Sequence, residues 1–193
     1  MNSLPLIIGI SGASGAIYGV RLLRHLKEAG IDTHLVLTKS AEMTLAYETD
    51  IASSEVKALA TKVHSPADIG ASIASGSFRT RGMIVAPCSM KSLAEIANGV
   101  TSGLLTRAAD VVLKERRRLV LLPRETPLHL GHIRNMAAVT EMGAICLPPV
   151  PAFYTRPQTI EEIVDHTLSR ALDLFDIDLG IAKRWGDGPR KGE

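Results

Sequence analysis

The segment 6–19, LIIGISGASGAIYG, restricts the fold more than any other part of the chain. Its apolar run 6–10 is short enough to be a fully buried strand, and a turn of small residues at 12–15 follows it. A helical pattern with apolar residues at regular spacing from Ile17 to Leu26 begins directly after the turn. A strand, a glycine turn and a helix in this order direct backbone N–H groups and the positive helix end toward an anion.

The glycines of this turn favour a mononucleotide over a dinucleotide. A dinucleotide-binding turn carries G-x-G-x-x-G, with an acidic residue at the end of the second strand. Gly12 and Gly15 form no G-x-G, and the second predicted strand, 33–37, runs into Thr38 without an acid. A flavin phosphate fits this pattern, with Ser14 as an added hydroxyl donor. The alternative is a tight turn that serves packing alone.

Strand patterns alternate with helical patterns along the chain. Strands are predicted at 6–10, 33–37, 83–86, 119–122 and 144–147, and Ser40 is expected to cap the helix after the second strand. This alternation predicts an α/β fold, a three-layer Rossmann-like or flavodoxin-like parallel sheet with helices on both faces. We expect one flavin-binding domain over 1–193, with a polar tail from about Lys183 that contains Trp185. The segment before Arg81 has no clear pattern, although 72–78 (SIASGSF) is small and hydroxyl-rich, like a binding loop.

Composition narrows the classes of function. Hydrophobic residues make up 46% of the chain and charged residues 22%, as in an ordinary globular protein. A net charge of +2 gives no support to nucleic acid or a membrane as a partner. No apolar run reaches the roughly 18 residues of a membrane span, and no signal segment is recognisable. The two cysteines form no disulfide framework, so the sequence predicts a cytoplasmic protein.

Polar residues follow several of the predicted strands. Ligands of parallel sheets bind beyond the carboxyl ends of the strands, so one site is expected to collect these residues. The segment Ser89–Ser92 opens a helix and is either a second anion-binding helix end or ordinary capping by Ser89. Arg124 and Glu125 follow the fourth predicted strand as a phosphate ligand and a proton carrier, or as a structural ion pair.

Other candidates depend on partners that the sequence alone does not identify. Arg107 and Lys114 lie seven apart, near one face of a helix, which suits a phosphate or a solvated surface equally. Cys88 fits a buried strand end better than a nucleophile. His129 and His132 have metal-ligand spacing, but no further ligand cluster supports them, so no metal is predicted.

Six segments together resemble the flavin prenyltransferase (UbiX-like) family over about residues 6–185: GASGAIYG, Glu48-Thr49-Asp50, PCSMKS, LLTRAADVVLKERR, PRETPLHLGH and PAFYTRPQ. The resemblance implies alkylation of reduced FMN by dimethylallyl monophosphate, release of phosphate and closure of a fourth ring on the flavin. It also implies a homododecamer, with prenylated FMN passed to a separate UbiD-type decarboxylase.

The resemblance further implies roles for matching positions. The expected proton carriers are Ser14, Glu48 and Glu125, and Lys114 belongs to both the catalytic and the substrate-binding set. The expected FMN contacts are Gly12, Ala13, Ser14, Thr38, Ser89, Met90, Lys91, Ser92 and Arg124. The expected ligands of the prenyl phosphate are Arg107, Lys114, Tyr154 and Arg170, which would hold the departing charge without a metal.

Two other functions stay open. An FMN-dependent decarboxylase of cysteine-type substrates would share the fold, but it would carry a catalytic His on an early helix and a Pro-Ala-Ser-Ala-Asn-Thr-like segment. This chain has PCSMKS at 87–92 instead. A carrier or sensor that binds FMN without chemistry is the other alternative, and the joint presence of Lys114, Glu125, Tyr154 and Arg170 argues against it.

Overall fold

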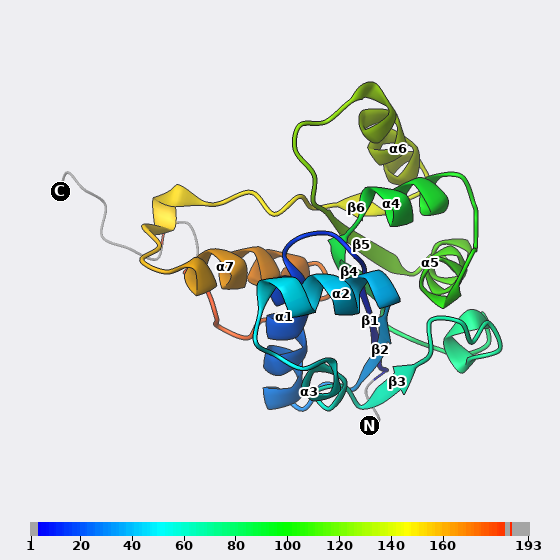
Figure 1. The fold of residues 1–193 in the computed structure, drawn as a ribbon, viewed down its shortest axis with the longest axis horizontal. Coiled ribbons are helices and arrows are strands. Elements are labelled where there is room, and N and C mark those ends of the chain that lie inside the picture. The colour runs from blue at the N-terminus through cyan, green and yellow to red at the C-terminus, as the bar shows by residue number, and fades with distance from the viewer. Residues whose placement is uncertain (1–3, 184–185, 187–193) are drawn as a thin grey trace.

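Six parallel strands form one sheet in a computed structural model that describes residues 4–183 and residue 186 (Figure 1). The spatial order β3-β2-β1-β4-β5-β6 is that of the Rossmann fold, which confirms the predicted fold class. The strands are β1 (Leu6–Ile10), β2 (Thr33–Leu37), β3 (Lys62–His64), β4 (Gly82–Cys88), β5 (Arg118–Pro123) and β6 (Ile145–Cys146).

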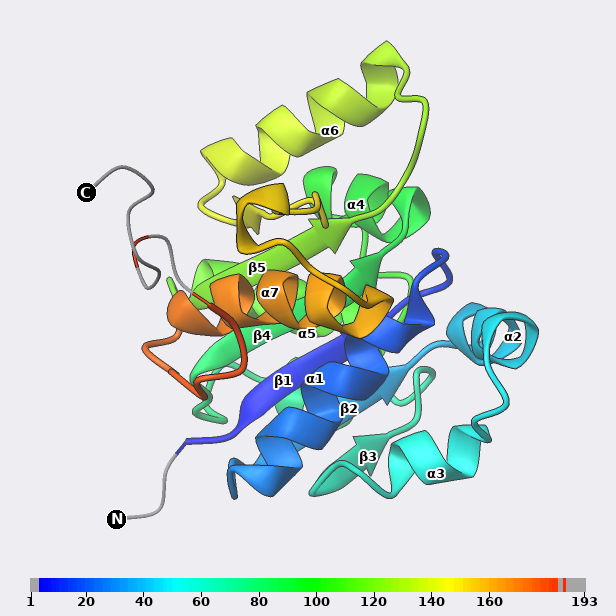
Figure 2. The same ribbon diagram turned by 90° about the vertical axis from the view of Figure 1, so that its left-hand side faces the viewer.

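Helices cover both faces of the sheet. In Figure 2, α1 and α7 lie in front of the strands, α4 and α5 lie behind them, and α6 projects from the upper edge. The helices are α1 (Ala16–Glu28), α2 (Lys39–Glu48), α3 (Ser53–Lys57), α4 (Met90–Ala97), α5 (Leu104–Lys114), α6 (Leu130–Glu141) and α7 (Ile160–Asp173), with short 3-10 turns η1 (Ser72–Ala74) and η2 (Phe153–Thr155). None of the helices in the described ranges has the length and apolar character to cross a bilayer.

Alternate residues of each strand divide the core into two layers. Ile8 and Ile84 belong to a buried cluster with residues of α1 and α7, whereas Ile7 and Met83 belong to a second cluster with residues of α4 and α5. Side chains of a strand alternate between the two faces, so a sheet covered on both sides needs an unbroken apolar run. This explains why β1 is buried at every position.

Some predicted boundaries were wrong. β3 was not predicted, because it has only three residues and two of them are exposed, too few for a recognisable period. Thr38, not Ser40, caps α2: its backbone is extended, and its hydroxyl accepts a hydrogen bond from the Ala41 N–H at 3.1 Å. The predicted tail lies outside the described residues apart from Lys183 and Gly186, so Trp185 is outside them too.

A buried histidine pair anchors the segment before β4. His34 Nδ1 and His64 Nε2 are 3.0 Å apart, and the Phe78 ring stacks on His34 with the ring centres 5.1 Å apart. Burial, then the neighbouring His64 and Lys62, lower the pKa of His34 to about 4. His34 is therefore neutral in the folded protein at neutral pH.

This shift predicts a pH-dependent loss of stability. The unfolded chain takes up a proton at His34 below about pH 6.5, whereas the folded chain does so only near its lowered pKa, so acid favours unfolding. We expect the free energy of unfolding to fall by about 1–2 kcal/mol from this group between about pH 7.5 and pH 5. Urea unfolding of the wild type and His34→Gln at both pH values measures it. An equal loss of stability in the variant would assign the effect to other groups.

Candidate active site

Ser11 joins the ends of β1 and β4, the point at which successive strands change from one side of β1 to the other. Its hydroxyl donates to the Pro87 carbonyl oxygen at 2.9 Å and accepts from the Ser89 N–H at 2.7 Å. The Arg124 N–H in turn donates to the Cys88 carbonyl at 3.2 Å. The reversal point of an open α/β sheet is where ligands bind, and these bonds bring the turn after β1, Ser89 and Arg124 to that point.

Gly12 is required for close packing of the turn against α2. A Cβ atom at Gly12 would collide with the Ser40 side chain and lie 3.0 Å from the Ser40 carbonyl carbon. The Thr38 N–H donates to the Ile10 carbonyl at 3.1 Å, which holds the start of α2 beside the end of β1. Ser14, at the top of the turn, is exposed, and its hydroxyl makes no hydrogen bond to another described residue.

Three helix N-termini face one hollow of about 200 Å³. They begin α2, α4 and α5, with Thr38, Ser89 and Gly103 as their capping residues. Helix N-termini and hydroxyls are the groups that bind a phosphate without a metal. The residues that line the hollow are Thr38, Ser40, Pro66, Ser89, Lys91, Ser92, Glu95, Ser102, Gly103, Leu104, Leu105 and Thr106.

The three-helix hollow is lined both by residues that were predicted from the sequence and by residues that were not. Ser89 both caps α4, accepting from the Ser92 N–H at 3.2 Å, and lines the hollow, so its two readings are compatible. Ser102 and Thr106 were not predicted, although a small hydroxyl-rich turn before a helix (Thr101-Ser102-Gly103) repeats the signal of the turn at 12–15. Glu95 lines the same hollow and takes a hydrogen bond from Ser102 at 2.8 Å.

The N-terminus of α1 already holds a carboxylate. Glu48, the last residue of α2, accepts from the Gly15 N–H at 2.8 and 3.1 Å and from the Ala16 N–H at 3.0 Å. The sequence analysis had directed this helix end at an external anion, and the structure places the Glu48 side chain there instead. The Glu48 carboxylate therefore occupies the N-terminus of α1, beside the turn that carries Ser14.

A second hollow, of about 450 Å³, lies along α7. Tyr154 and Arg170, two of the residues predicted to bind the prenyl phosphate, both line it. The Tyr154 hydroxyl lies 2.9 Å from His166 Nε2, and Arg170 donates to Asp173 at 2.8 Å. Burial, then the positive charge of Arg170, lower the pKa of His166, so this ring stays neutral beside the phenol at neutral pH.

Tyr18, in the first turn of α1, contacts Thr167 of α7 and lies within the electrostatic influence of Arg124; it was not among the residues predicted from the sequence. Burial raises the pKa of its phenol, while contact with Thr167 and the charge of Arg124 oppose that rise. Arg124 and Glu125 are both exposed, and they form no ion pair with each other among the residues described. Glu125 accepts instead from the Thr126 N–H at 2.9 Å, so its carboxylate is held at the strand end.

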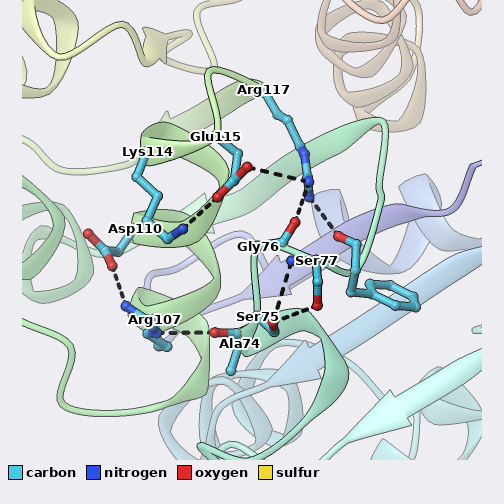
Figure 3. A network of polar contacts seen from close by, with 10 residues as sticks. Ala74, Ser75, Gly76, Ser77, Arg107, Asp110, Lys114, Glu115 and Arg117 are labelled. Carbon is cyan, nitrogen blue, oxygen red and sulfur yellow. Dashed lines mark hydrogen bonds and ion pairs between the residues drawn. The ribbon is translucent and has the colours of Figure 1, made fainter.

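Within one chain, Lys114 and Arg107 line neither the three-helix hollow nor the hollow along α7. α5 begins at the three-helix hollow and runs about 15 Å to Lys114, four residues before β5 begins, at the amino edge of the sheet. There Lys114 donates to Glu115 at 2.5 Å. Arg107 donates to Asp110 at 2.7 Å and to the Ala74 carbonyl at 3.3 Å (Figure 3). Ser14 lies four residues past the carboxyl end of β1, at the opposite edge.

Two remaining candidates have structural explanations. Cys88 is fully buried, and burial raises the pKa of its thiol, as expected for an unreactive core cysteine. His129 caps α6, accepting from the Gly131 N–H at 3.0 Å, and its ring lies 3.6 Å from that of His132. In the part of the chain that the structure describes, no group of three His, Cys, Asp or Glu side chains could hold a metal ion.

Comparison with known proteins places the chain in a family. The Flavoprotein family model matches residues 1–172. The flavin prenyltransferase UbiX of Thauera aromatica is 57% identical over 182 residues, which cover 94% of each chain. The chain belongs to the UbiX-like flavin prenyltransferase family.

Solved structures agree with this membership. AnUbiX (PadA1), solved in complex with FMN and dimethylallyl pyrophosphate, matches with a TM-score of 0.95 and 49% identity, over 97% of this chain and all of the other. The dodecameric FMN-dependent UbiX-like decarboxylase of Escherichia coli O157:H7 matches with a TM-score of 0.92 and 52% identity, over 94% of this chain and 99% of the other. The UbiX-like fold therefore extends over nearly the whole chain.

Proposed function

We propose that this chain transfers the dimethylallyl group of dimethylallyl monophosphate to N5 and C6 of reduced FMN and releases phosphate. The observation that carries the proposal is the pair of hollows in a UbiX-like chain. One hollow is lined by three helix N-termini and suits the FMN phosphate; the other is lined by Tyr154 and Arg170 and suits the phosphate of the prenyl donor.

The residues around the turn at 12–15 handle the flavin. Thr38, Ser89 and Ser92 offer hydroxyls at the three-helix hollow, with Lys91 at its rim. Gly12 and Ala13 belong to the turn that contacts the flavin, and Gly12 lets this turn pack closely on α2. Arg124 follows β5, the second strand along the sheet from β1. Bound reduced FMN supplies the nucleophilic nitrogen and ring carbon, and the protein supplies binding and orientation.

Cations hold the charge that leaves with the phosphate. When the C–O bond of the allyl phosphate breaks, its electron pair departs with the phosphate, and Arg170, Lys114 and the Tyr154 hydroxyl stabilise that charge. Closure of the new ring joins C6 to the substituted carbon of the prenyl double bond, so the neighbouring alkene carbon takes up a proton and C6 loses one. Glu48, Glu125 and the departing phosphate are the candidate acceptors, and Glu48 is already oriented by the N-terminus of α1.

Assembly completes the site in this proposal. Lys114 and Arg107 lie on α5, on the opposite face of the sheet from α7, so a neighbouring copy brings them to the Tyr154 hollow. A dodecamer like that of the Escherichia coli relative provides such contacts. The product, prenylated FMN, is a cofactor rather than an end product, so a separate UbiD-type decarboxylase consumes it.

The reaction is tested by incubating the purified protein with reduced FMN and dimethylallyl monophosphate without oxygen. Mass measurement of the flavin should show a product heavier by the prenyl group. Unmodified flavin would argue for a carrier. Release of carbon dioxide from a cysteine-containing peptide, again with unmodified flavin, would argue for a decarboxylase.

Replacing Ser14 by alanine should slow turnover about tenfold or more and leave the fold intact, because the exposed Ser14 hydroxyl supports no described contact. Single-turnover formation of prenylated FMN measures the change, and thermal unfolding checks the fold. Thr44→Val is the control, since its hydroxyl only bonds the Ser40 carbonyl within α2. A normal rate for Ser14→Ala would reduce Ser14 to a turn residue.

A further inference from the structure

We propose that Arg117 is a positioning residue for Lys114: it clamps the turn 76–78 against the end of α5 and so fixes the Lys114 ammonium. This inference rests on the proposed function, in which Lys114 holds the phosphate of the prenyl donor. It gives a role to the segment 72–78, which the sequence analysis singled out as hydroxyl-rich and which none of the assigned roles uses.

The clamp is a two-point bond from one guanidinium. Arg117 Nη1 donates to the Phe78 carbonyl at 2.7 Å, and Nη2 donates to the Gly76 carbonyl at 2.7 Å (Figure 3). The Arg117 side chain is only 18% exposed. Charge-assisted bonds of this length from a rigid fork define an orientation that a lysine at the same place would not reproduce.

The turn 76–78 lies in close contact with the Lys114–Glu115 pair. A Cβ atom at Gly76 would lie 2.9 Å from Lys114 Nζ and would collide with the Glu115 carboxylate. Glu115 in turn accepts from Lys114 and lies 4.0 Å from Arg117 Nη2. The Lys114 hydrogen bond lowers the pKa of Glu115, so its carboxyl group is ionised at neutral pH. Lys114 is thus confined by the Gly76 backbone on one side and Glu115 on the other.

The same segment contacts the second cation of the set. Arg107 Nε donates to the Ala74 carbonyl at 3.3 Å, and Phe78 stacks on the buried His34 ring. The segment is therefore attached to the core at Phe78 and to α5 at Arg107, with Arg117 holding it between these points. Because both cations contact the segment 72–78, Arg107 at Ala74 and Lys114 beside Gly76, movement of that segment would displace the charge that they present to a phosphate.

Two variants test the clamp from opposite sides. Arg117→Ala releases the turn, and Gly76→Ala pushes the ends of the Lys114 and Glu115 side chains away, which costs little stability because those ends are flexible. Each should raise KM for dimethylallyl monophosphate by about tenfold or more and leave FMN affinity within about twofold of the wild type. Added guanidinium should restore part of the loss in Arg117→Ala and none of it in Gly76→Ala.

Arg116→Ala is the matched control. Arg116 is exposed and adjacent, and its replacement removes the same charge without touching the turn. Its backbone φ of 55° strains arginine and alanine alike, so the substitution adds no new strain. KM should stay within about twofold of the wild type. Size-exclusion chromatography of all variants checks that the assembly is intact.

The outcomes separate this inference from the proposed function. Wild-type protein that makes no prenylated FMN would remove the proposed function. Active wild type, with Arg117→Ala losing thermal stability but keeping a normal KM, would make Arg117 structural only and overturn the inference. A normal KM for Gly76→Ala would overturn it as well, even where Arg117→Ala fails to fold.

Discussion

Lys114→Ala is expected to lower kcat/KM for dimethylallyl monophosphate by about 100-fold or more and to leave FMN binding unchanged. An ammonium that binds the phosphate of the prenyl donor and also stabilises it as it departs acts on both KM and kcat, so its loss lowers kcat/KM and leaves the affinity for flavin unchanged. Steady-state kinetics with saturating reduced FMN measures the effect. Loss of FMN binding with unchanged affinity for the prenyl phosphate would show that the role is wrongly assigned.

The same variant tests whether two chains share one site. Lys114, at the end of α5, and Arg170, on α7, belong to helices on opposite faces of the sheet in one chain. A site that needs both would take them from two chains, so Arg170→Ala should be as inactive as Lys114→Ala. Co-expression of the two variants builds mixed oligomers, in which about a quarter of shared sites would contain both native residues. Recovery of about a quarter of wild-type activity is therefore expected. No recovery of activity would mean that both residues belong to a site within one chain, or that they belong to no shared site.

Asp165→Ala is expected to lower the free energy of unfolding by about 2–3 kcal/mol. Asp165 accepts from Arg21 at 2.7 and 2.6 Å and lies 2.9 Å from His25 Nε2, and these bonds join α7 to α1. The Asp165 side chain is 13% exposed and that of Arg21 is 21% exposed, so removal of the carboxylate leaves a poorly solvated guanidinium without its partner. For a chain of this length, the melting temperature should fall by roughly 5–10 °C.

A solvated ion pair provides the control for that experiment. Lys57 and Glu42 are 2.6 Å apart with 41% and 34% exposed side chains, and Glu42→Ala should cost less than about 1 kcal/mol. Unfolding is compared at one protein concentration, because assembly shifts apparent stability. Equal losses in the two variants would show that Asp165 contributes no more than a surface charge.

Asp165→Ala is also expected to raise KM for dimethylallyl monophosphate, because Arg170 lies on the helix that Asp165 anchors.

Acid should remove the contribution of Asp165. Burial alone would raise the pKa of this carboxyl, but the hydrogen bonds from Arg21 and His25 outweigh burial and leave it below its ordinary value. A lowered carboxyl pKa means that the stabilisation is complete above the unfolded pKa of about 3.9 and is lost as the pH falls through the folded value. The wild type and Asp165→Ala should therefore approach each other in stability below about pH 4.

The parts of this protein that local patterns encode were predictable. The buried run of β1, the turn at 12–15 and the start of α1 appear where the sequence places them, because burial on both sheet faces, turn chemistry and helical spacing each leave a signature within a few residues. The family was recognisable for a related reason, since its motifs are short and lie in a specific order.

The contacts between distant segments required the tertiary structure. Glu48 reaches the α1 N-terminus across 33 positions, and Arg117 reaches Gly76 across 41, and neither pairing leaves a periodic trace in the sequence. The three-helix hollow is likewise decided by which helix ends the sheet order brings together. The sequence by itself determined the strand–turn–helix units, the α/β class and the family. Only the packed sheet decided which helix end is free for a phosphate and that Lys114 lies away from the turn at 12–15, because these depend on how the crossovers stack.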